Sequence, residues 1–404
     1  MPAEERRALQ ERRLAELVGR LRAGPSEYWR EKLRGADGLE SLPFTTKSEL
    51  RDYYPFGTLA VPLEQTVRVH ASSGTRGKPL VVAYTAADIE LFADVNARAL
   101  ACAGARPSDV LHVAYGYGLF TGGLGLHYGG ERLGATVVPA SGGNPALQLE
   151  LMADLGANGL ACTPSFALLL AERAEDGLRE RIPLRYGIFG AEPWSESMRE
   201  KLETAWEIDA CDVYGLSEII GPGVAAECRE NKGALHVFDD HFLPEIVDHD
   251  TGQAVATGER GELVLTTVTK EAFPVLRYRT GDVTSFVDGR CPCGRTHRRI
   301  ARFSGRVDDM LVVRGINVFP SEIEAVVLDD PALGGQYAIV VDRRTTLPEL
   351  EIHVEGTSEG LASRLEQRLR LRCLVVAHEP GSLPRTETGK AKRLFERTDD
   401  AEPW

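Results

Sequence analysis

Between residues 66 and 215, short apolar runs alternate with longer amphipathic stretches, and this alternation limits the chain to few folds. The apolar runs predict strands at 66–70, 80–84, 110–115, 135–140, 159–164, 186–191 and 211–215. Helix-like stretches such as 86–104 and 195–208 separate them. Strands that alternate with helices form mostly parallel sheets, with the helices covering both faces. The pattern therefore predicts an α/β fold.

The pattern changes twice in the rest of the chain. After about residue 235, strands joined by turns indicate an antiparallel barrel or sandwich. From about residue 309, strands and two helices, one beginning at Ser321, have the length of a small α+β domain. We expect a large N-terminal domain (1–308) of mostly parallel sheets with a β-barrel-like subdomain, and a small mobile α+β C-terminal domain (309–404).

Charge and cysteine content exclude several classes of protein. The formal net charge of −13 argues against a nucleic-acid partner, because an acidic chain repels a phosphate backbone. The sequence contains no long apolar run, and its first residues form a charged helix, so we expect a cytoplasmic protein without membrane contact. Seven cysteines in 404 residues do not indicate a disulfide scaffold.

A glycine-rich loop, SSGTRGKP at 72–79, lies between two predicted strands. Its glycines allow the backbone to approach a ligand, and its hydroxyls and Lys78 can donate to phosphate oxygens. The spacing is not that of a Walker A loop, and a strand follows instead of a helix. A plain hairpin turn is the alternative interpretation.

Three further polar segments carry candidate residues. Glu218 follows a predicted strand, where open α/β sheets bind their ligands, and its carboxylate can bind Mg²⁺. Asp282, in YRTGDV, can accept hydrogen bonds from ribose hydroxyls. The loop PRTETGKAKR at 384–393 is basic and carries Lys390. Taken singly, each segment has a plain alternative, namely a surface carboxylate, an ordinary turn or a solvated tail.

The order of these segments resembles the phenylacetate–CoA ligase family of the adenylate-forming superfamily, which includes acyl-CoA synthetases, adenylation domains and luciferase. The resemblance runs from about residue 45 to residue 396. Its most specific stretches are HASSGTRGKP, YGYGLFTGGLGLHYGGERLGATVVP, FGAEPWSE, YGLSEIIGPGVAAEC, TKEAFPVLRYRTGDVT, GRVDDMLVVRGINVFPSEIE and EPGSLPRTETGKAKR.

The resemblance implies a role for residues in each segment. The ATP phosphates would contact Ser72, Ser73, Gly74, Thr75, Gly77 and Lys78. The adenine would lie against Ala191, Glu192, Pro193, Tyr214 and Gly215. Asp282 and Arg306 would bind the ribose, and Glu218 would hold Mg²⁺. Asp308 would be the hinge of the small domain, which would bring the catalytic Lys390 into the site. These placements suit nucleotidyl transfer, which depends on positioning and on neutralising negative charge.

One position departs from the family. Arg76 stands where the phosphate loop of the family usually has Thr. An Arg at this position either adds a phosphate contact or points to solvent, and the sequence leaves both open.

The stretch 115–123 sets aromatic residues among glycines, and in this family it borders the acid substrate. Aromatic rings with space beside them suit a flat aryl acid. We expect Tyr115, Phe120 and Gly190 near the ring. A core strand followed by a glycine-rich turn is the alternative, and the identity of the aromatic acid does not follow from these residues.

A second candidate site involves cysteines. CPCGRTH (291–297) presents two thiols on a tight turn, and Cys228 and His236 lie in ECRENKGALH. Some members of the family carry a structural zinc in this region, and structural zinc takes four protein ligands. We predict zinc at Cys228, His236, Cys291 and Cys293, with His297 as the competing fourth ligand and free surface thiols as the alternative.

The leading functional hypothesis is an aryl-acid–CoA ligase, which uses ATP and Mg²⁺ to form an acyl-adenylate and then passes the acyl group to CoA. A second hypothesis keeps adenylation but transfers the acyl group to a carrier-protein thiol or an amine. A third is a nucleotide- or zinc-binding module without catalysis. For the oligomeric state, a homodimer is the default expectation.

Overall fold

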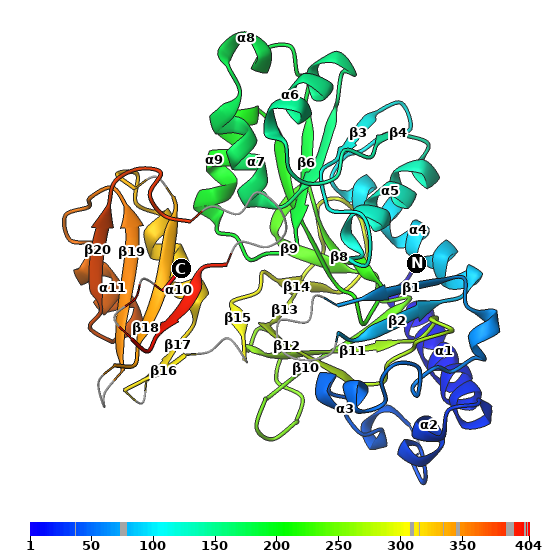
Figure 1. Ribbon diagram of the computed structural model, residues 1–404. Helices are drawn as coiled ribbons and strands as arrows, with labels where there is room; N and C mark the ends of the chain where they lie inside the picture. The colour runs from blue at the N-terminus through cyan, green and yellow to red at the C-terminus, as the bar shows by residue number, and fades with distance from the viewer. Residues whose placement is uncertain are drawn as a thin grey trace.

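The residues that the computed structural model describes are 1–36, 38–72, 79–307, 311–314, 316–333, 335–344, 348–384, 392–399, 401 and 403–404. They form a large α/β part and a smaller α+β part beside it (Figure 1). In the described chain, no helix is both long and apolar enough to cross a membrane.

A nine-stranded mixed sheet is the centre of the large part, with the order β13-β14-β9-β8-β7-β6-β5-β3-β4. Its strands are β3 (Val110–Val113), β4 (Thr136–Val138), β5 (Gly159–Cys162), β6 (Tyr186–Gly190), β7 (Asp209–Leu216), β8 (Gly221–Cys228), β9 (Asn231–Val237), β13 (Phe286–Val287) and β14 (Arg299–Ala301). Strands β3 to β7 pair in parallel. Every residue of β5 and β6 is buried, as expected for parallel strands covered on both faces.

The change to antiparallel pairing comes earlier in the chain than the sequence indicated. We expected it after about residue 235, but β8 already pairs antiparallel with β7, and β9 with β8. The reason is the short connection between β7 and β8, which reverses the chain and leaves no room for a crossover helix.

Two groups of helices cover the two faces of the large sheet. One group is α4 (Ala86–Cys102) and α5 (Gly122–Leu133), which pack on each other and on β8. The other group is α6 (Pro145–Asp154), α7 (Pro164–Arg173), α8 (Asp176–Arg179) and α9 (Glu196–Trp206). The expected helical runs 86–104 and 195–208 are therefore α4 and α9. Both begin at a side-chain cap, Thr85 for α4 and Ser195 for α9.

A second, antiparallel sheet corresponds to the predicted barrel-like subdomain. Its order is β10-β11-β12-β15, and its strands are β10 (Phe242–Val247), β11 (Gly261–Thr267), β12 (Tyr278–Thr284) and β15 (Gly305–Arg306). Beside it, β1 (Arg68–Ala71) and β2 (Val81–Tyr84) pair antiparallel as a hairpin. These two strands are thus not part of the parallel sheet, although the sequence pattern grouped them with it.

The N-terminal segment contains one long helix followed by short helical elements. They are α1 (Ala3–Ala23), α2 (Glu27–Lys32), α3 (Lys47–Asp52) and the 3₁₀ turns η1 (Leu39–Ser41) and η2 (Leu63–Gln65). Of these, α3 contacts β12 of the second sheet. Thr45 forms an isolated bridge with Tyr278 of β12. Its N–H donates a hydrogen bond to Arg277 O, and its C=O accepts one from Arg279 N. The start of the chain is therefore attached to a strand that is far away in sequence.

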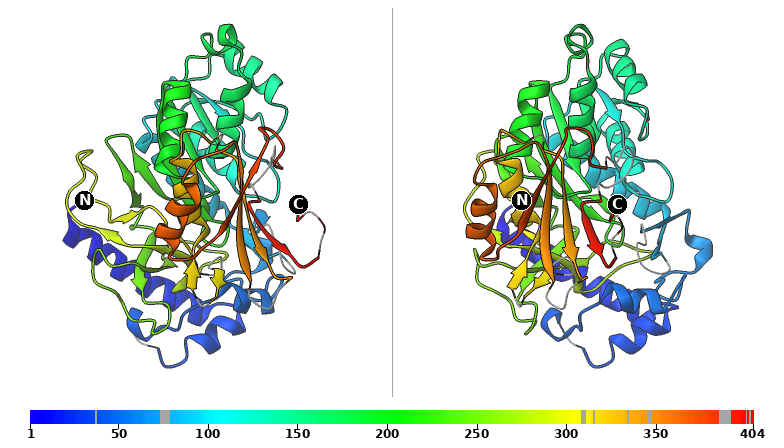
Figure 2. Two further views of the ribbon diagram at one scale, coloured as in Figure 1. Left: turned by 90° about the vertical axis from the view of Figure 1, so that its left-hand side faces the viewer. Right: turned by 60° about the vertical axis from the view of Figure 1, so that its left-hand side comes forward.

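The smaller part has its own sheet, in the order β20-β19-β18-β21, with helices on one face. Its elements are β16 (Leu311–Val313), β17 (Ile316–Val318), α10 (Pro320–Leu328), β18 (Tyr337–Asp342), β19 (Glu349–Glu355), α11 (Leu361–Leu369), β20 (Leu374–His378) and β21 (Leu394–Arg397). Helix α10 packs on α9 of the large part, and the two views of Figure 2 show this side of the molecule. Across this contact, Ser197 Oγ donates a hydrogen bond to the main-chain oxygen of Leu328.

Candidate active site and cysteine cluster

The carboxyl end of β6 approaches its neighbour very closely. A Cβ on Gly190 would lie 2.2 Å from the main-chain oxygen of Val213 on β7, so only glycine fits at this position. Ala191 follows with φ of +71°, a conformation that residues other than glycine rarely adopt. The Glu192 carboxylate accepts a hydrogen bond from Ser165 N at 2.8 Å. The predicted adenine-contacting segment 191–193 is thus a strained turn at the carboxyl end of β6.

Next to this turn, β7, β12 and β15 bring three predicted residues together. Tyr214 Oη donates to Asp282 Oδ2 at 2.5 Å, and Arg306 Nη1 donates to Asp282 Oδ1 at 2.7 Å. The Tyr214 ring stacks on Phe303 with 4.2 Å between ring centroids. Burial, and then the charge of Asp282, raise the pKa of Tyr214 well above its usual value, so its hydroxyl stays protonated.

The turn between β7 and β8 holds Glu218, whose side chain is only 2% exposed. Its Oε1 lies 2.6 Å from Lys47 Nζ, at the start of α3. Below it, the fully buried Lys270 directs Nζ to the Glu218 main-chain oxygen at 3.4 Å and lies over the Tyr84 ring. Burial lowers the pKa of Lys270 to about 7. Glu218 therefore contacts two lysines, Lys47 through its carboxylate and Lys270 through its main-chain oxygen.

The sequence did not predict either lysine. TKEAFP contains Lys270 and belongs to a stretch typical of the family, which was a signal for that residue. Lys47 lies in a capping box at a helix start, which predicts local structure but no long-range partner.

The predicted acyl pocket begins directly after β3. Tyr115 is buried, and its hydroxyl lies beside the main chain of Gly190. The ring of Phe120 covers Gly122, where an added Cβ would lie 2.4 Å from Phe120 Cε1. Tyr115 and Gly190 are thus neighbours, and their place beside the ring of the substrate, with that of Phe120, stays a prediction.

The smaller part faces this region with charged groups of its own. Glu324 is buried beside Arg393, and Arg393 lies over the Tyr337 ring with 4.3 Å from guanidinium carbon to centroid. Burial raises the pKa of Glu324, while Arg393 lowers it and Glu192 of the large part raises it further. The turn after β6 is therefore within electrostatic reach of the smaller part.

Several predicted residues lie outside the residues that the structure describes. They are Ser73, Gly74, Thr75, Arg76, Gly77 and Lys78 of the phosphate loop, Asp308 of the hinge, and Lys390. Ser72 is described, and it bonds to Leu80 twice, through Ser72 N to Leu80 O and Leu80 N to Ser72 Oγ. The ends of the phosphate loop are therefore held together by the β1–β2 hairpin.

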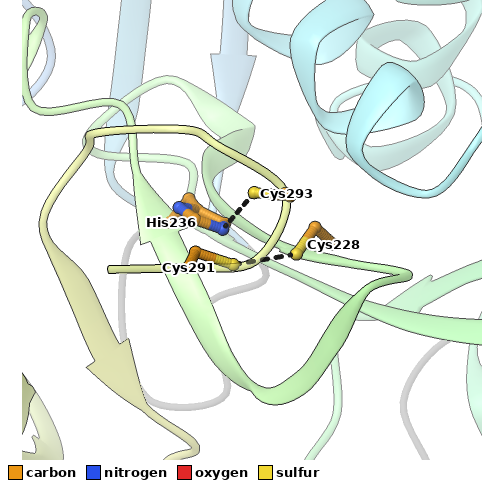
Figure 3. A group of neighbouring side chains, drawn as sticks. All are labelled: Cys228, His236, Cys291 and Cys293. Carbon is orange, nitrogen blue, oxygen red and sulfur yellow. Dashed lines mark hydrogen bonds between the residues drawn. The ribbon is translucent and has the colours of Figure 1, made fainter. Parts of the chain in front are cut away.

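A second polar site lies elsewhere in the large part of the protein. Cys228 ends β8, His236 lies on β9, and Cys291 and Cys293 lie on the loop before β14 (Figure 3). Their ligand atoms all lie within 4.8 Å of one another. The Sγ atoms of Cys228 and Cys291 are 3.5 Å apart, and Cys293 Sγ is 3.5 Å from His236 Nε2.

These distances fit ligand atoms arranged tetrahedrally around one metal ion. Ligands at about 2.3 Å for sulfur and about 2.0 Å for nitrogen around zinc lie roughly 3.5–3.8 Å from each other. Burial, followed by Arg295, lowers the pKa of His236 to about 4, so its imidazole is neutral, as a metal ligand must be. His297 instead pairs with Asp239 at 2.9 Å and is not part of the group.

Comparisons with known proteins agree with this geometry. The pattern of the AMP-binding enzyme family matches residues 31–269, and that of the AMP-binding enzyme C-terminal domain matches residues 315–398. Fold and site together thus define an AMP-binding enzyme. Phenylacetate-coenzyme A ligase of Thermus thermophilus is 46% identical, over 98% of this chain and 97% of its own. The Escherichia coli enzyme of that name is 48% identical, over 91% and 87%. The chain therefore belongs to the phenylacetate–coenzyme A ligase family.

Solved structures add information on the arrangement of the two parts. A 2-hydroxyisobutyryl-CoA ligase in the postadenylation state matches with a TM-score of 0.90 at 27% identity, covering 98% of this chain and 90% of that one. The same ligase in the thioesterification state matches with a TM-score of only 0.73. Because both scores come from the same ligase, the difference in TM-score reflects how the two parts of that ligase are arranged relative to each other. The arrangement of the two parts of this chain is therefore more similar to the first of these structures than to the second.

Proposed function

We propose that this chain activates phenylacetate with ATP, forming phenylacetyl-AMP and pyrophosphate, and then transfers the acyl group to the thiol of CoA. The observation that carries this proposal is the meeting of the β6 turn, the Tyr214–Asp282–Arg306 group and Glu218 at one edge of the sheet, in a chain of this family. The acid and the acceptor in this proposal, phenylacetate and CoA, are taken from the names of the relatives given above.

In this scheme, each group at the sheet edge has one task. Ala191, Glu192 and Pro193 border the adenine, with Tyr214 and Gly215 on the other side. Asp282 accepts hydrogen bonds from the ribose hydroxyls, and its pairing with Tyr214 and Arg306 fixes its two oxygens. The loop from Ser72 to Lys78 surrounds the phosphates. Positioning of this kind supplies most of the acceleration in nucleotidyl transfer.

Glu218 is the residue that we propose as the Mg²⁺ ligand, because its carboxylate is buried and already faces a cation, the Lys47 ammonium, 2.6 Å from Oε1. When bound, the cation would neutralise phosphate charge. The carboxylate of the acid and the triphosphate are both anions, so a further cation is needed between them. We assign that role to Lys390, carried by a small domain that begins after Asp308 and closes on the site.

The acyl group would lie between Tyr115, Phe120 and Gly190. The hydroxyl of Tyr115 lies beside the main chain of Gly190, and we expect it to face a polar atom of the substrate. Aromatic side chains such as Tyr115 and Phe120 favour a flat ring over an aliphatic chain.

The cysteine cluster would hold a structural zinc. Cys228, His236, Cys291 and Cys293 form a closed set of four ligands, which leaves no open coordination position for catalysis. Its task would be to fasten the loop before β14 to β8 and β9.

The test is acid-dependent exchange of pyrophosphate into ATP, with phenylacetate, benzoate and 2-hydroxyisobutyrate as the acids. We expect phenylacetate to give the highest kcat/KM, and loss of free CoA thiol to accompany turnover. Faster exchange with 2-hydroxyisobutyrate would overturn the aromatic assignment. Exchange without consumption of CoA thiol would instead indicate a carrier-protein or amine acceptor.

A further inference from the structure

The backbone of Lys47 is held in place by several local contacts. This lysine is the first residue of α3, whose capping box pairs Thr46 with Glu49 in both directions. Lys32 fixes the same turn, because its Nζ bonds Glu49 Oε1 at 2.5 Å and the Phe44 main-chain oxygen at 2.8 Å. The backbone of Lys47 is therefore fixed independently of Glu218.

The segment just before Lys47 is fixed to the second sheet. Thr45 N bonds Arg277 O at 3.1 Å, Arg279 N bonds Thr45 O at 2.9 Å, and Thr45 Oγ1 donates to Leu276 O at 2.7 Å. Thr45 thus extends the sheet beside β12, the strand that carries Asp282. This placement brings Lys47 from the N-terminal segment to the candidate nucleotide site.

The ion pair between Lys47 and Glu218 is asymmetric. The Glu218 side chain is 2% exposed and the Lys47 side chain is 39% exposed. An unpaired carboxylate at that depth would be costly, and Lys47 balances its charge beside Lys270 and Tyr278, which also interact with Glu218. Lys47 has a long side chain that reaches water and can turn away, whereas Glu218 is enclosed. A cation that replaces Lys47 at Glu218 would leave the lysine free beside the site.

We propose that Lys47 is a positioning residue of the adenylation site, which occupies Glu218 while no divalent cation is bound and moves to the phosphate oxygens of ATP when the cation binds. The inference rests on the proposed function in taking Glu218 as the cation ligand. Lys47 and the cation exclude each other at one carboxylate, so metal alone binds weakly, and metal with a triphosphate binds well because the phosphates receive the displaced charge.

The test is binding of Mn²⁺ to the nucleotide-free, zinc-loaded protein, followed by electron paramagnetic resonance. We expect Lys47→Gln to bind Mn²⁺ about tenfold more tightly than the unchanged protein, since a competing charge is removed. The same variant should have a KM for ATP that is raised about tenfold. Lys47→Arg, which keeps the charge, should restore the weak Mn²⁺ binding. Unchanged or weaker Mn²⁺ binding by Lys47→Gln would overturn the proposal.

Two controls separate this role from a purely structural one. Lys32→Gln removes the neighbouring lysine that braces α3, and it should leave Mn²⁺ affinity unchanged. Lys47→Gln combined with Glu218→Gln should lose the gain in Mn²⁺ affinity, and retention of that gain would place the cation elsewhere. Lys47→Met serves the same test if Lys47→Gln does not fold. Because Mn²⁺ binding needs neither acid nor turnover, a failed exchange assay would contradict the proposed activity alone.

Discussion

The two polar sites of this protein are built in opposite ways. The cysteine cluster draws its ligands from β8, β9 and one adjoining loop, all within the large part, and three of its four residues are buried. The candidate active site draws residues from the N-terminal segment, from both sheets and from the smaller part. A site contained in one rigid unit can hold its shape, whereas a site divided between two units can be assembled and taken apart during a reaction.

The largest expected effect tests whether the smaller part completes the candidate active site. Lys390→Ala should lower acid-dependent pyrophosphate exchange by about 100-fold or more, because the cation proposed to lie between the acid carboxylate and the α-phosphate is then lost. Binding of ATP, measured by calorimetry, should change by less than about threefold. Lys392→Ala is the matched control, since Lys392 lies over the Phe395 ring and belongs to the same strongly basic stretch. Full exchange activity in Lys390→Ala would show that the smaller part does not complete the site.

Loss of a ligand from the cysteine cluster should lower the thermal stability of the protein. Cys291→Ser should remove the zinc, measured by mass spectrometry, and lower Tm by about 10 °C, because the metal fastens a loop to two strands. Cys102→Ala alters a buried thiol next to the cluster and should keep the zinc. A fully zinc-loaded Cys291→Ser protein, or a native protein purified without zinc, would contradict the assignment.

A smaller effect is expected at the acyl pocket, which lies wholly in the large part. Phe120→Ala should raise KM for phenylacetate about tenfold and leave KM for ATP nearly unchanged, because one aromatic wall is lost. Leu119→Ala is the control, since the neighbouring Leu119 is 64% exposed. Equal effects of the two substitutions would argue against Phe120 as a pocket residue.

The smallest effect concerns the contact between the two parts. Ser197→Ala removes the hydrogen bond to Leu328, worth about 1 kcal/mol, and favours other arrangements of the smaller part. The ratio of adenylation rate to thioester formation rate should fall by about threefold in single-turnover experiments. Ser195→Ala removes the neighbouring helix cap and is expected to lower stability without that change in ratio.

Much of the fold could be predicted because it is encoded locally. The alternating runs predicted β3 to β7 and the helices α4 and α9, since each element carries its own periodicity. The early change to antiparallel pairing at β8 was missed, because strand direction depends on connection length and not on strand composition.

The candidate site was predicted in part. Tyr214, Asp282 and Arg306 were named individually, and the structure places them in contact. The pairing of Lys47 with Glu218 could not be predicted, because it joins segments far apart in sequence and leaves no local pattern. The roles of the residues in the phosphate loop, of Asp308 and of Lys390 stay predictions, since these residues lie outside the described chain.

The attachment of Thr45 to β12 has a consequence for biosynthesis. Residues near the N-terminus leave the ribosome early, but the strand that receives Thr45 is made more than halfway through synthesis. The first helices must therefore wait, with their apolar faces incompletely covered, until β12 has emerged. Maturation of the N-terminal segment, and with it the delivery of Lys47, is consequently a late event in the formation of the native protein.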